Sequence, residues 1–217
     1  MLTGNYKVLY ERLTATIDQK RIFHDPLHTL AFGTDASLYR LIPKIVIRAK
    51  DEKEVSKILL ESSDLSIPVT FRAAGTSLSG QAITDSVLVI SGNHWKKFHI
   101  SENGFEIRLQ PGLRGGSVNA LLAPYGRKIG PDPASVNAAM IGGIAANNAS
   151  GMCCGTAENS YKTVAGMLII LADGTLLNTR DQSSKDAFSE SHPQLLAEIP
   201  RIMAMLFPVT TGTVNGE

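Results

Sequence analysis

The sequence has 217 residues, of which 43% are hydrophobic and 19% are charged, with 21 lysines and arginines against 20 aspartates and glutamates. This composition is typical of a globular protein and excludes the low hydrophobicity and high net charge of a disordered chain. A net charge of +1 gives no basic surface for nucleic acid. No segment approaches the roughly 20 apolar residues of a membrane-spanning helix. We therefore expect neither a nucleic-acid partner nor a membrane span.

The N-terminus and the two cysteines indicate a reducing compartment. Residues 1–13 lack the charged leader and apolar core of a signal peptide. Cys153 and Cys154 are adjacent, so a disulfide between them would strain the peptide, and two ligands are too few for a zinc or iron–sulfur site. We expect two reduced cysteines, no metal site and a cytoplasmic location.

The first 41 residues contain one recognisable element. Apolar residues recur at helical spacing over residues 5–18 and predict a helix. Residues 21–41 look irregular, because Asp25-Pro26 and Gly33 are typical breakers of regular structure.

A strand–helix–strand pattern follows. Residues 44–49 and 66–72 have the apolar character of strands. Between them, Asp51 and Glu54 form an acidic variant of the capping box and mark the start of a helix. This order is that of a βαβ unit, so the two strands are predicted to be parallel neighbours joined by a right-handed crossover.

The rest of the chain alternates short apolar segments with turn signals. Five short strands are predicted, over residues 87–90, 98–101, 105–110, 164–171 and 175–179. Asn103-Gly104 and Asp173-Gly174 mark the turns of two hairpins, and residues 117–125 predict a helix. We expect an α+β fold, with a small parallel α/β subdomain over residues 1–75 and a second subdomain with a mainly antiparallel sheet and flanking helices over residues 76–217.

The C-terminal region carries little pattern. Residues 181–192 are polar and charged, and residues 195–207 predict a last helix interrupted at Pro200. Residues 209–217 show no core pattern and should be loose.

The stretch FRAAGTSLSG, residues 71–80, is the most informative part of the sequence. It follows a predicted strand, and its small and hydroxyl residues allow consecutive backbone N–H groups to converge on an anion, to which Arg72 can add a positive charge. It lacks the Gly-Lys-Ser/Thr ending of a P-loop and the three glycines of the dinucleotide-binding fingerprint. The pattern by itself fits an anion-binding loop and a plain turn equally well.

A second stretch is built from small residues. Residues 130–135 read GPDPAS, and every residue from 138 to 151 except Met140 is Ala, Gly, Asn, Ser or Ile. Such a segment lets a flat or phosphorylated ligand lie against the backbone. It also fits a tight crossing of a helix over a sheet, where small residues are needed for packing.

Together the two stretches resemble the FAD-binding domain of the vanillyl-alcohol oxidase/p-cresol methylhydroxylase superfamily, in its D-lactate and D-2-hydroxy-acid dehydrogenase branch. RAAGTSLSG resembles the pyrophosphate loop of that family, and PDPAS with MIGGIAANNASG resembles its second FAD-contacting segment. MLIILADGTLL resembles the hairpin that follows. NNASGMCCGTAENSYKT is similar to the long relatives in which an iron–sulfur region follows the flavin domain. The resemblance covers roughly residues 24–180.

The resemblance implies which residues contact FAD. The implied cofactor-binding residues are Arg72, Ala73, Ala74, Gly75, Thr76, Ser77, Leu78 and Gly80 around the pyrophosphate, Pro131, Asp132, Ala134 and Ser135 near the flavin, Ile141, Gly142 and Gly143 along the cofactor, Asn147, Ser150 and Gly151 on the same wall, and Val164 at the adenine end. No histidine occurs in residues 71–80, so FAD should be bound non-covalently. The family commonly has glycine at the positions of Ala73 and Ala74, where a methyl group is tolerated only if φ is not positive.

The family also implies a function, namely an FAD-linked oxidoreductase that transfers a hydride from C2 of a D-2-hydroxy acid to flavin N5. Its substrate-binding and base residues come mainly from a cap domain C-terminal to the flavin domain, and its iron–sulfur cysteines lie further on. Nothing after Thr179 resembles either part, so we expect an N-terminal fragment of a longer enzyme. We assign no catalytic residue, since Asp132 lies between two prolines where a turn residue is expected anyway.

Two alternatives stay open. The chain can be a cofactor-binding module without turnover of its own, because the cap is absent. It can also be the flavin domain of a cell-wall enolpyruvyl reductase, which PDPAS and NNASG disfavour. The sequence does not specify the substrate or the electron acceptor. If the acceptor is bound to a membrane, the enzyme is expected at the membrane periphery.

Overall fold

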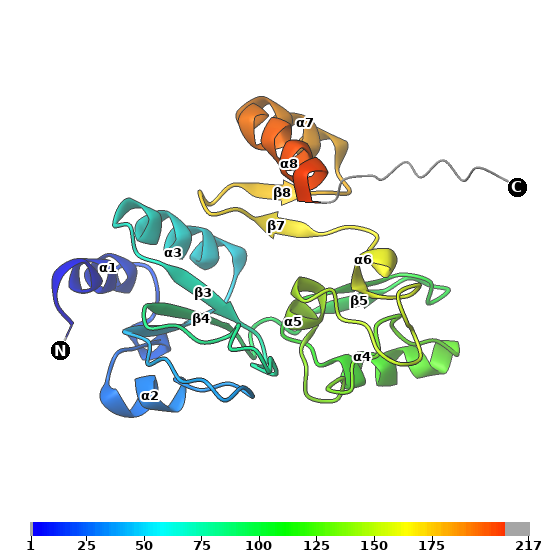
Figure 1. The fold of residues 1–217 in the computed structure, drawn as a ribbon, viewed down its shortest axis with the longest axis horizontal. Helices are drawn as coiled ribbons and strands as arrows, with labels where there is room; N and C mark the ends of the chain where they lie inside the picture. The colour runs from blue at the N-terminus through cyan, green and yellow to red at the C-terminus, as the bar shows by residue number, and fades with distance from the viewer. Residues whose placement is uncertain (1, 207–217) are drawn as a thin grey trace, which may run out of the picture. The chain divides into compact units, whose positions relative to one another are not determined.

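The computed structural model describes residues 2–206 (Figure 1). This part of the chain divides into two compact units. Unit 1 contains residues 2–164 and 170–175, and unit 2 contains residues 165–169 and 176–206. None of the helices in the described residues is long and apolar enough to cross a membrane. The predicted division at residue 75 lies inside unit 1 and stays a prediction.

Unit 1 begins with a four-stranded sheet in the order β1-β2-β4-β3. Its strands are β1 (Ile22–Phe23), β2 (Ile45–Ala49), β3 (Val69–Arg72) and β4 (Val87–Ser91). β4 runs parallel to both β2 and β3, whereas β1 is antiparallel to β2.

The prediction that the strands around residues 44–49 and 66–72 are neighbours is wrong, because β4 lies between them. The first four residues of β4 are all buried, whereas no residue of β3 is. A strand that is apolar on both faces is stabilised most at the centre of a sheet, where both faces are covered. The half-exposed β3 is therefore left at the edge.

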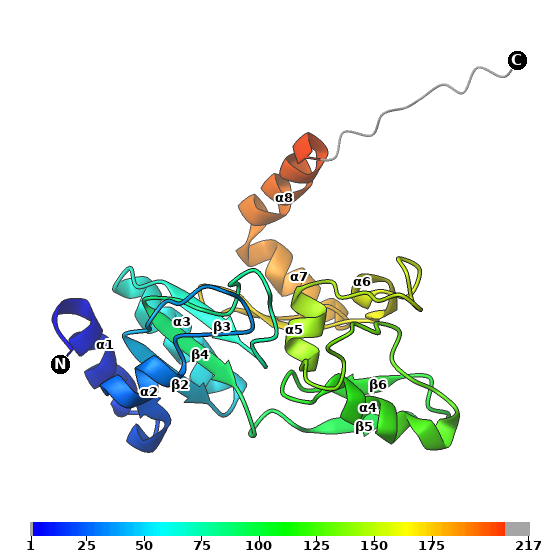
Figure 2. The same cartoon turned by 60° about the horizontal axis from the view of Figure 1, so that its bottom comes forward.

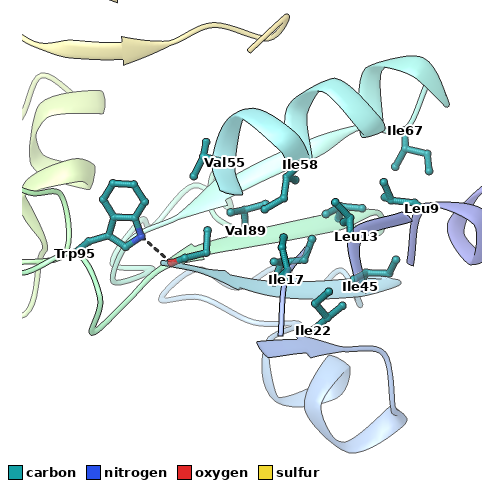
Figure 3. Close-up of a cluster of buried hydrophobic side chains, with 13 residues drawn as sticks. Leu9, Leu13, Ile17, Ile22, Ile45, Val55, Ile58, Ile67, Val89 and Trp95 are labelled. Atoms are coloured by element: carbon teal, nitrogen blue, oxygen red, sulfur yellow. Dashed lines mark hydrogen bonds between the residues drawn. The ribbon is translucent and has the colours of Figure 1, made fainter. Parts of the chain in front are cut away.

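Two helices pack over one face of this sheet and form the main core. α1 (Gly4–Thr14) contributes Leu9 and Leu13, and α3 (Glu52–Asp64) contributes Val55 and Ile58 (Figure 3). α3 begins as predicted, since the Asp51 side chain accepts a hydrogen bond from the Glu54 amide at 2.9 Å. At the end of the core Trp95 donates from Nε1 to the Ala49 carbonyl at 2.7 Å, as Figure 3 shows.

The prediction of irregular structure over residues 21–41 is wrong in part. A short 3-10 turn (Gln19–Arg21), β1 and α2 (Pro26–Ala31) form there. The Asp25 side chain caps α2 by accepting from the His28 amide at 3.1 Å, and Pro26 occupies the first turn. Proline at that position lacks only an amide hydrogen that would be unpaired anyway, so Asp-Pro starts a helix here. Figure 1 shows α2 and α3 on opposite sides of the sheet.

The second half of unit 1 is built around a hairpin. β5 (Phe98–Ile100) and β6 (Ile107–Leu109) pair antiparallel, as predicted. α4 (Gly115–Leu122) lies against them in both views (Figures 1 and 2) and is followed by a 3-10 turn (Ala123–Tyr125). Val118 and Leu122 of α4 pack with apolar residues of the hairpin in a second core.

Two short helices complete unit 1, α5 (Ile141–Ala146) and α6 (Ser160–Thr163). The sequence did not predict α5, because Gly142-Gly143 lies inside it and glycine disfavours a helix. Close packing explains the glycine at position 142, since a Cβ added there would lie 2.7 Å from Cβ of Pro111.

Four elements follow along the chain: β7 (Leu168–Ile170), β8 (Leu176–Asn178), α7 (Gln182–Ser191) and α8 (Pro193–Leu206). β7 and β8 pair in a two-stranded sheet, and both are shorter than the strands predicted over residues 164–171 and 175–179. α7 arises in the polar segment because Asp181 caps it, accepting from the Ser183 amide at 3.0 Å. The last helix forms as predicted, but the interruption predicted at Pro200 is wrong, because α8 continues through that residue. The prediction for residues 209–217 falls outside the described residues.

Candidate functional site

The loop after β3 presents a run of backbone donors. Within residues 2–206, none of the amides of residues 74–78 donates a hydrogen bond. Gly75 and Gly80 both have φ +71° and give the loop its turns. Ala73 and Ala74 do not have positive φ, so their methyl groups cause no backbone strain. The loop therefore combines free N–H groups with a backbone that a ligand can approach closely.

Arg72 lies directly beneath this loop. Its Nη1 donates to the carbonyl of Thr34 at 2.7 Å and to that of Phe32 at 3.2 Å. A Cβ added to Gly75 would lie 2.6 Å from Nε of Arg72. Burial lowers the pKa of the Arg72 guanidinium, and the charge of Asp35 opposes this effect. Arg72 thus supports the loop from below and holds a positive charge there.

A cavity of about 460 Å³ opens beside the loop. Its lining residues are Phe32, Arg72, Ala73, Ala74, Thr76, Ile90, Arg114, Asn137, Ala138 and Met140. The lining holds two arginines, several apolar side chains and no carboxylate. Such a cavity suits a ligand with both an anionic part and an apolar part.

The small-residue segment lies next to the loop. A Cβ added to Gly143 of α5 would lie 3.7 Å from Cβ of Ala73, which is an ordinary contact. α5 is anchored on the side of Gly142, whose amide donates to the Pro111 carbonyl at 3.0 Å. The two adjacent glycines therefore differ: Gly142 is needed for packing, and Gly143 faces the loop that carries the free amides.

Asp132 ties the segment GPDPAS to the turn that contains both cysteines. Its carboxylate accepts hydrogen bonds from the amides of Cys154 and Cys153, both at 3.1 Å. Hydrogen bonding from Cys154, and then from Cys153, lowers the pKa of Asp132 to about 2. Gly151 lies so close to the backbone of Asp132 that a Cβ at position 151 would not fit. Each carboxylate oxygen accepts from one of these two amides, which is a structural use of this side chain.

Sequence reasoning did not identify Ser160, which fixes the end of α5. Ser160 is buried, and its hydroxyl donates to the carbonyls of Ile144 at 2.9 Å and Ala149 at 3.1 Å. Asn148 is in the left-handed region with φ +43° and accepts from the Tyr161 amide at 3.0 Å. The signal that was overlooked is Asn159 before Ser160, since asparagine is a preferred helix cap and does cap α6.

The predicted site residues thus fall into groups. Arg72, Ala73, Ala74 and Thr76 line the cavity. Gly75, Ser77 and Gly80 shape the loop, in which the Ser77 hydroxyl accepts from the Ser79 amide at 3.1 Å, and Leu78 is exposed. The lining does not include Pro131, Asp132, Ala134, Ser135, Ile141, Gly142, Gly143, Asn147, Ser150, Gly151 or Val164. Conversely, the structure adds Arg114 and Asn137, for which the sequence carried no signal. The assignment of these residues to cofactor contacts stays a prediction.

The fold and the loop geometry agree with a known family. Residues 43–180 match the family described as FAD binding domain, so the chain belongs to this family. The resemblance stated from the motifs is confirmed.

Several proteins similar in sequence to this chain are named as enzymes that act on hydroxy acids. The chain is 35% identical over 136 residues to glycolate oxidase subunit GlcD of Escherichia coli, covering 61% of this chain and 27% of that protein. It is 28% identical over 155 residues to D-2-hydroxyglutarate dehydrogenase of Pantoea ananatis, covering 70% and 15%. It is 32% identical over 152 residues to D-lactate dehydrogenase [cytochrome] 1, mitochondrial, of Saccharomyces cerevisiae, covering 67% and 25%. The chain therefore spans about a quarter or less of the length of these relatives.

Solved structures confirm the predicted fold class. Alkyldihydroxyacetonephosphate synthase superposes with a TM-score of 0.69 at 15% identity, covering 83% of this chain and 37% of that chain. 4-Ethylphenol oxidase from Gulosibacter chungangensis superposes with a TM-score of 0.67 at 18% identity, covering 82% and 35%. At these identities the likeness concerns the fold alone.

Proposed function

We propose that this chain forms the FAD-binding part of an oxidoreductase that acts on a D-2-hydroxy acid, with the cofactor held non-covalently. The names of the relatives support the substrate class, since they include glycolate, D-2-hydroxyglutarate and D-lactate. The chemistry that FAD supplies when bound is the acceptance of a hydride at N5, here from C2 of the hydroxy acid.

One observation carries the proposal: the free amides of residues 74–78 lie beside a basic cavity without a carboxylate. A diphosphate needs several donors at short range and a positive field, and both are present before any ligand binds. The cavity also has apolar side chains from Phe32, Ile90 and Met140, which fit the apolar surface of a nucleotide. The residues of this chain therefore fit the cofactor of the family.

The other predicted residues receive supporting roles in this proposal. Residues 73–78 and 80 cradle the diphosphate through the backbone. Gly143 continues the same wall next to Ala73, with Ile141 and Gly142 behind it. Asp132 and Gly151 hold their two segments together, which positions Pro131, Ala134 and Ser135 towards the flavin and Asn147, Ser150 and Val164 along the rest of the cofactor. No histidine occurs in residues 71–80, which favours non-covalent attachment.

An absorbance spectrum tests this function. The purified 217-residue chain is mixed with FAD, separated from free cofactor by gel filtration and examined for the flavin bands. We expect flavin to remain with the protein and to be released on denaturation, because the attachment is non-covalent. A folded chain that carries no flavin after this treatment contradicts the proposal.

A cofactor-binding module without turnover is the second candidate. The lining of the cavity includes no histidine, aspartate or glutamate that could serve as a general base. D-Lactate and D-2-hydroxyglutarate, each with a dye as electron acceptor, distinguish the two candidates. We expect little or no turnover by this chain alone, and measurable turnover would contradict the module. The natural electron acceptor is unidentified, and we place the protein in the cytoplasm, with peripheral membrane contact through that acceptor as the alternative.

A further inference from the structure

We infer that Arg114, rather than Arg72, is the side chain that contacts a phosphate group of the bound dinucleotide. This inference rests on the proposed function. Both arginines line the cavity, but their guanidinium groups are in different situations.

Arg72 is already committed to the protein. Its Nη1 donates to two backbone carbonyls, at 2.7 and 3.2 Å. The guanidinium also lies so close to the Gly75 backbone that no side chain fits between them. Turning Arg72 towards a ligand would break these hydrogen bonds and remove the support of the loop. Arg72 is therefore a positioning residue that keeps the amides of residues 74–78 in place.

Arg114 is free to bind a ligand. It is exposed, and within residues 2–206 its side chain makes no hydrogen bond, ion pair or ring contact. Its backbone is fixed, because its carbonyl accepts from the Val118 amide at 3.0 Å and it forms an antiparallel bridge with Met140. The backbone of Arg114 is therefore held in place, while its positively charged guanidinium has no partner within residues 2–206.

Two backbone amides at the start of α4 are already used within the protein. The Gly115 amide donates to the Ala139 carbonyl at 3.0 Å, and the Gly116 amide donates to the Val136 carbonyl at 2.9 Å. Arg114 is the positively charged side chain that this segment contributes to the cavity lining. A planar guanidinium can bind phosphate through two parallel hydrogen bonds, so Arg114 complements the backbone donors that come from the loop after β3.

Equilibrium binding to the cofactor-free 217-residue chain tests the inference. FAD is titrated and followed by its fluorescence, and ADP is titrated as a competitor that carries the diphosphate without the flavin. The variants are Arg114→Gln, Arg114→Lys and, as a matched loss of one positive charge, Arg108→Gln. Arg108 is exposed on β6 and does not line the cavity.

We expect Arg114→Gln to weaken FAD and ADP to a similar extent, by about tenfold each, because one charged hydrogen-bonding contact is lost. Arg114→Lys should lie between, since a lysine keeps the charge but loses the planar fork. Arg108→Gln should bind both ligands like the unmodified chain.

Three outcomes overturn the inference. Equal affinities of Arg114→Gln and Arg108→Gln would show that Arg114 makes no contact, while leaving FAD binding by the chain intact. A loss for FAD without a loss for ADP would assign Arg114 to the flavin half instead of a phosphate. If the unmodified chain binds neither ligand, the proposed function itself fails, and the inference fails with it.

Discussion

Gly75 is constrained by two independent features of its surroundings. Its φ of +71° lies in the region that residues with a Cβ rarely adopt. In addition, a Cβ would displace the Arg72 guanidinium, which is held by two carbonyls. The first constraint is common to several glycines in the chain, and the second is specific to the loop after β3.

We predict that Gly75→Ala lowers the affinity of the chain for FAD by at least about tenfold, while the chain still folds. The backbone strain costs about 1 kcal/mol, and the displaced Arg72 moves the loop amides out of position. Gly126→Ala is the matched control, because Gly126 has φ +65° with nothing within 4 Å of an added Cβ. Fluorescence titration with FAD and thermal unfolding separate the two effects. Equal FAD affinities of the two variants would contradict the role of this close contact.

Asp132 gives a prediction about pH. Its folded-state pKa is about 2 because of hydrogen bonds from Cys154 and Cys153, whereas an unfolded aspartate titrates near its ordinary value of about 3.9. A depressed pKa stabilises the fold above the unfolded value, and this contribution is lost as the pH falls through about 2. Asp132→Asn lacks it at every pH.

Thermal unfolding across this pH range checks the prediction. We expect Asp132→Asn to melt below the unmodified chain near neutral pH, with the difference shrinking as the pH falls from about 4 to about 2. A difference that stays constant over this range would mean that the carboxylate charge does not hold the turn.

At the scale of elements, α5 places two glycines in different environments. A Cβ at Gly142 would lie 2.7 Å from Cβ of Pro111, and a Cβ at Gly143 would lie at an ordinary 3.7 Å from Cβ of Ala73. We predict that Gly142→Ala lowers the stability of unit 1 by about 1–3 kcal/mol, which is typical of overpacking. Gly143→Ala should keep its stability.

Bulk at position 143 should instead affect the ligand. Gly143→Val projects branched methyl groups beside the loop after β3, so we expect weaker FAD binding with little change in folding. Urea unfolding and FAD titration of the three variants provide the test. A Gly143→Val protein that is fully folded and keeps its full FAD affinity would show that the small residues of α5 serve packing only.

Individual helices and strands were predicted from the sequence better than which of them lie side by side. Periodicity and capping residues are local, so α3, its Asp51 cap and the hairpin of β5 and β6 were predictable. The position of β4 between β2 and β3 results from competition among strands for the buried centre of the sheet, which no local pattern records. α5 was missed for a related reason: Gly142 is needed there because Pro111, far away in the sequence, packs against it.

The site shows the same limit. Residues 72–80 could be predicted as a candidate anion-binding loop, because such a loop needs small residues in a continuous segment. Arg114 could not be predicted as a residue of the candidate site, since an isolated arginine carries no pattern and its place in the cavity lining depends on where α4 begins in space. Phe32 and Asn137 also reach the cavity from separate segments. A candidate loop of small residues can therefore be recognised from the sequence, whereas the side chains that complete the cavity are known only from the fold.

At the scale of the whole molecule, the cavity connects segments that fold into two cores. Phe32 and Ile90 belong to the core of the first sheet around Val46 and Leu88. Arg114, Asn137 and Met140 come from the segments around α4 and α5. A ligand in the cavity touches both, so its binding free energy should stabilise both parts of unit 1 together.

We predict that FAD at one hundred times its dissociation constant stabilises the native chain by about 2.7 kcal/mol. Hydrogen exchange followed by mass spectrometry should show slower exchange in β3, β4, α4 and α5 together. α7 is an internal control, because none of the residues of unit 2 within 2–206 lines the cavity. Slower exchange confined to the first sheet would contradict a shared site, since a ligand held only by the loop after β3 would leave α4 and α5 to open as they do without FAD.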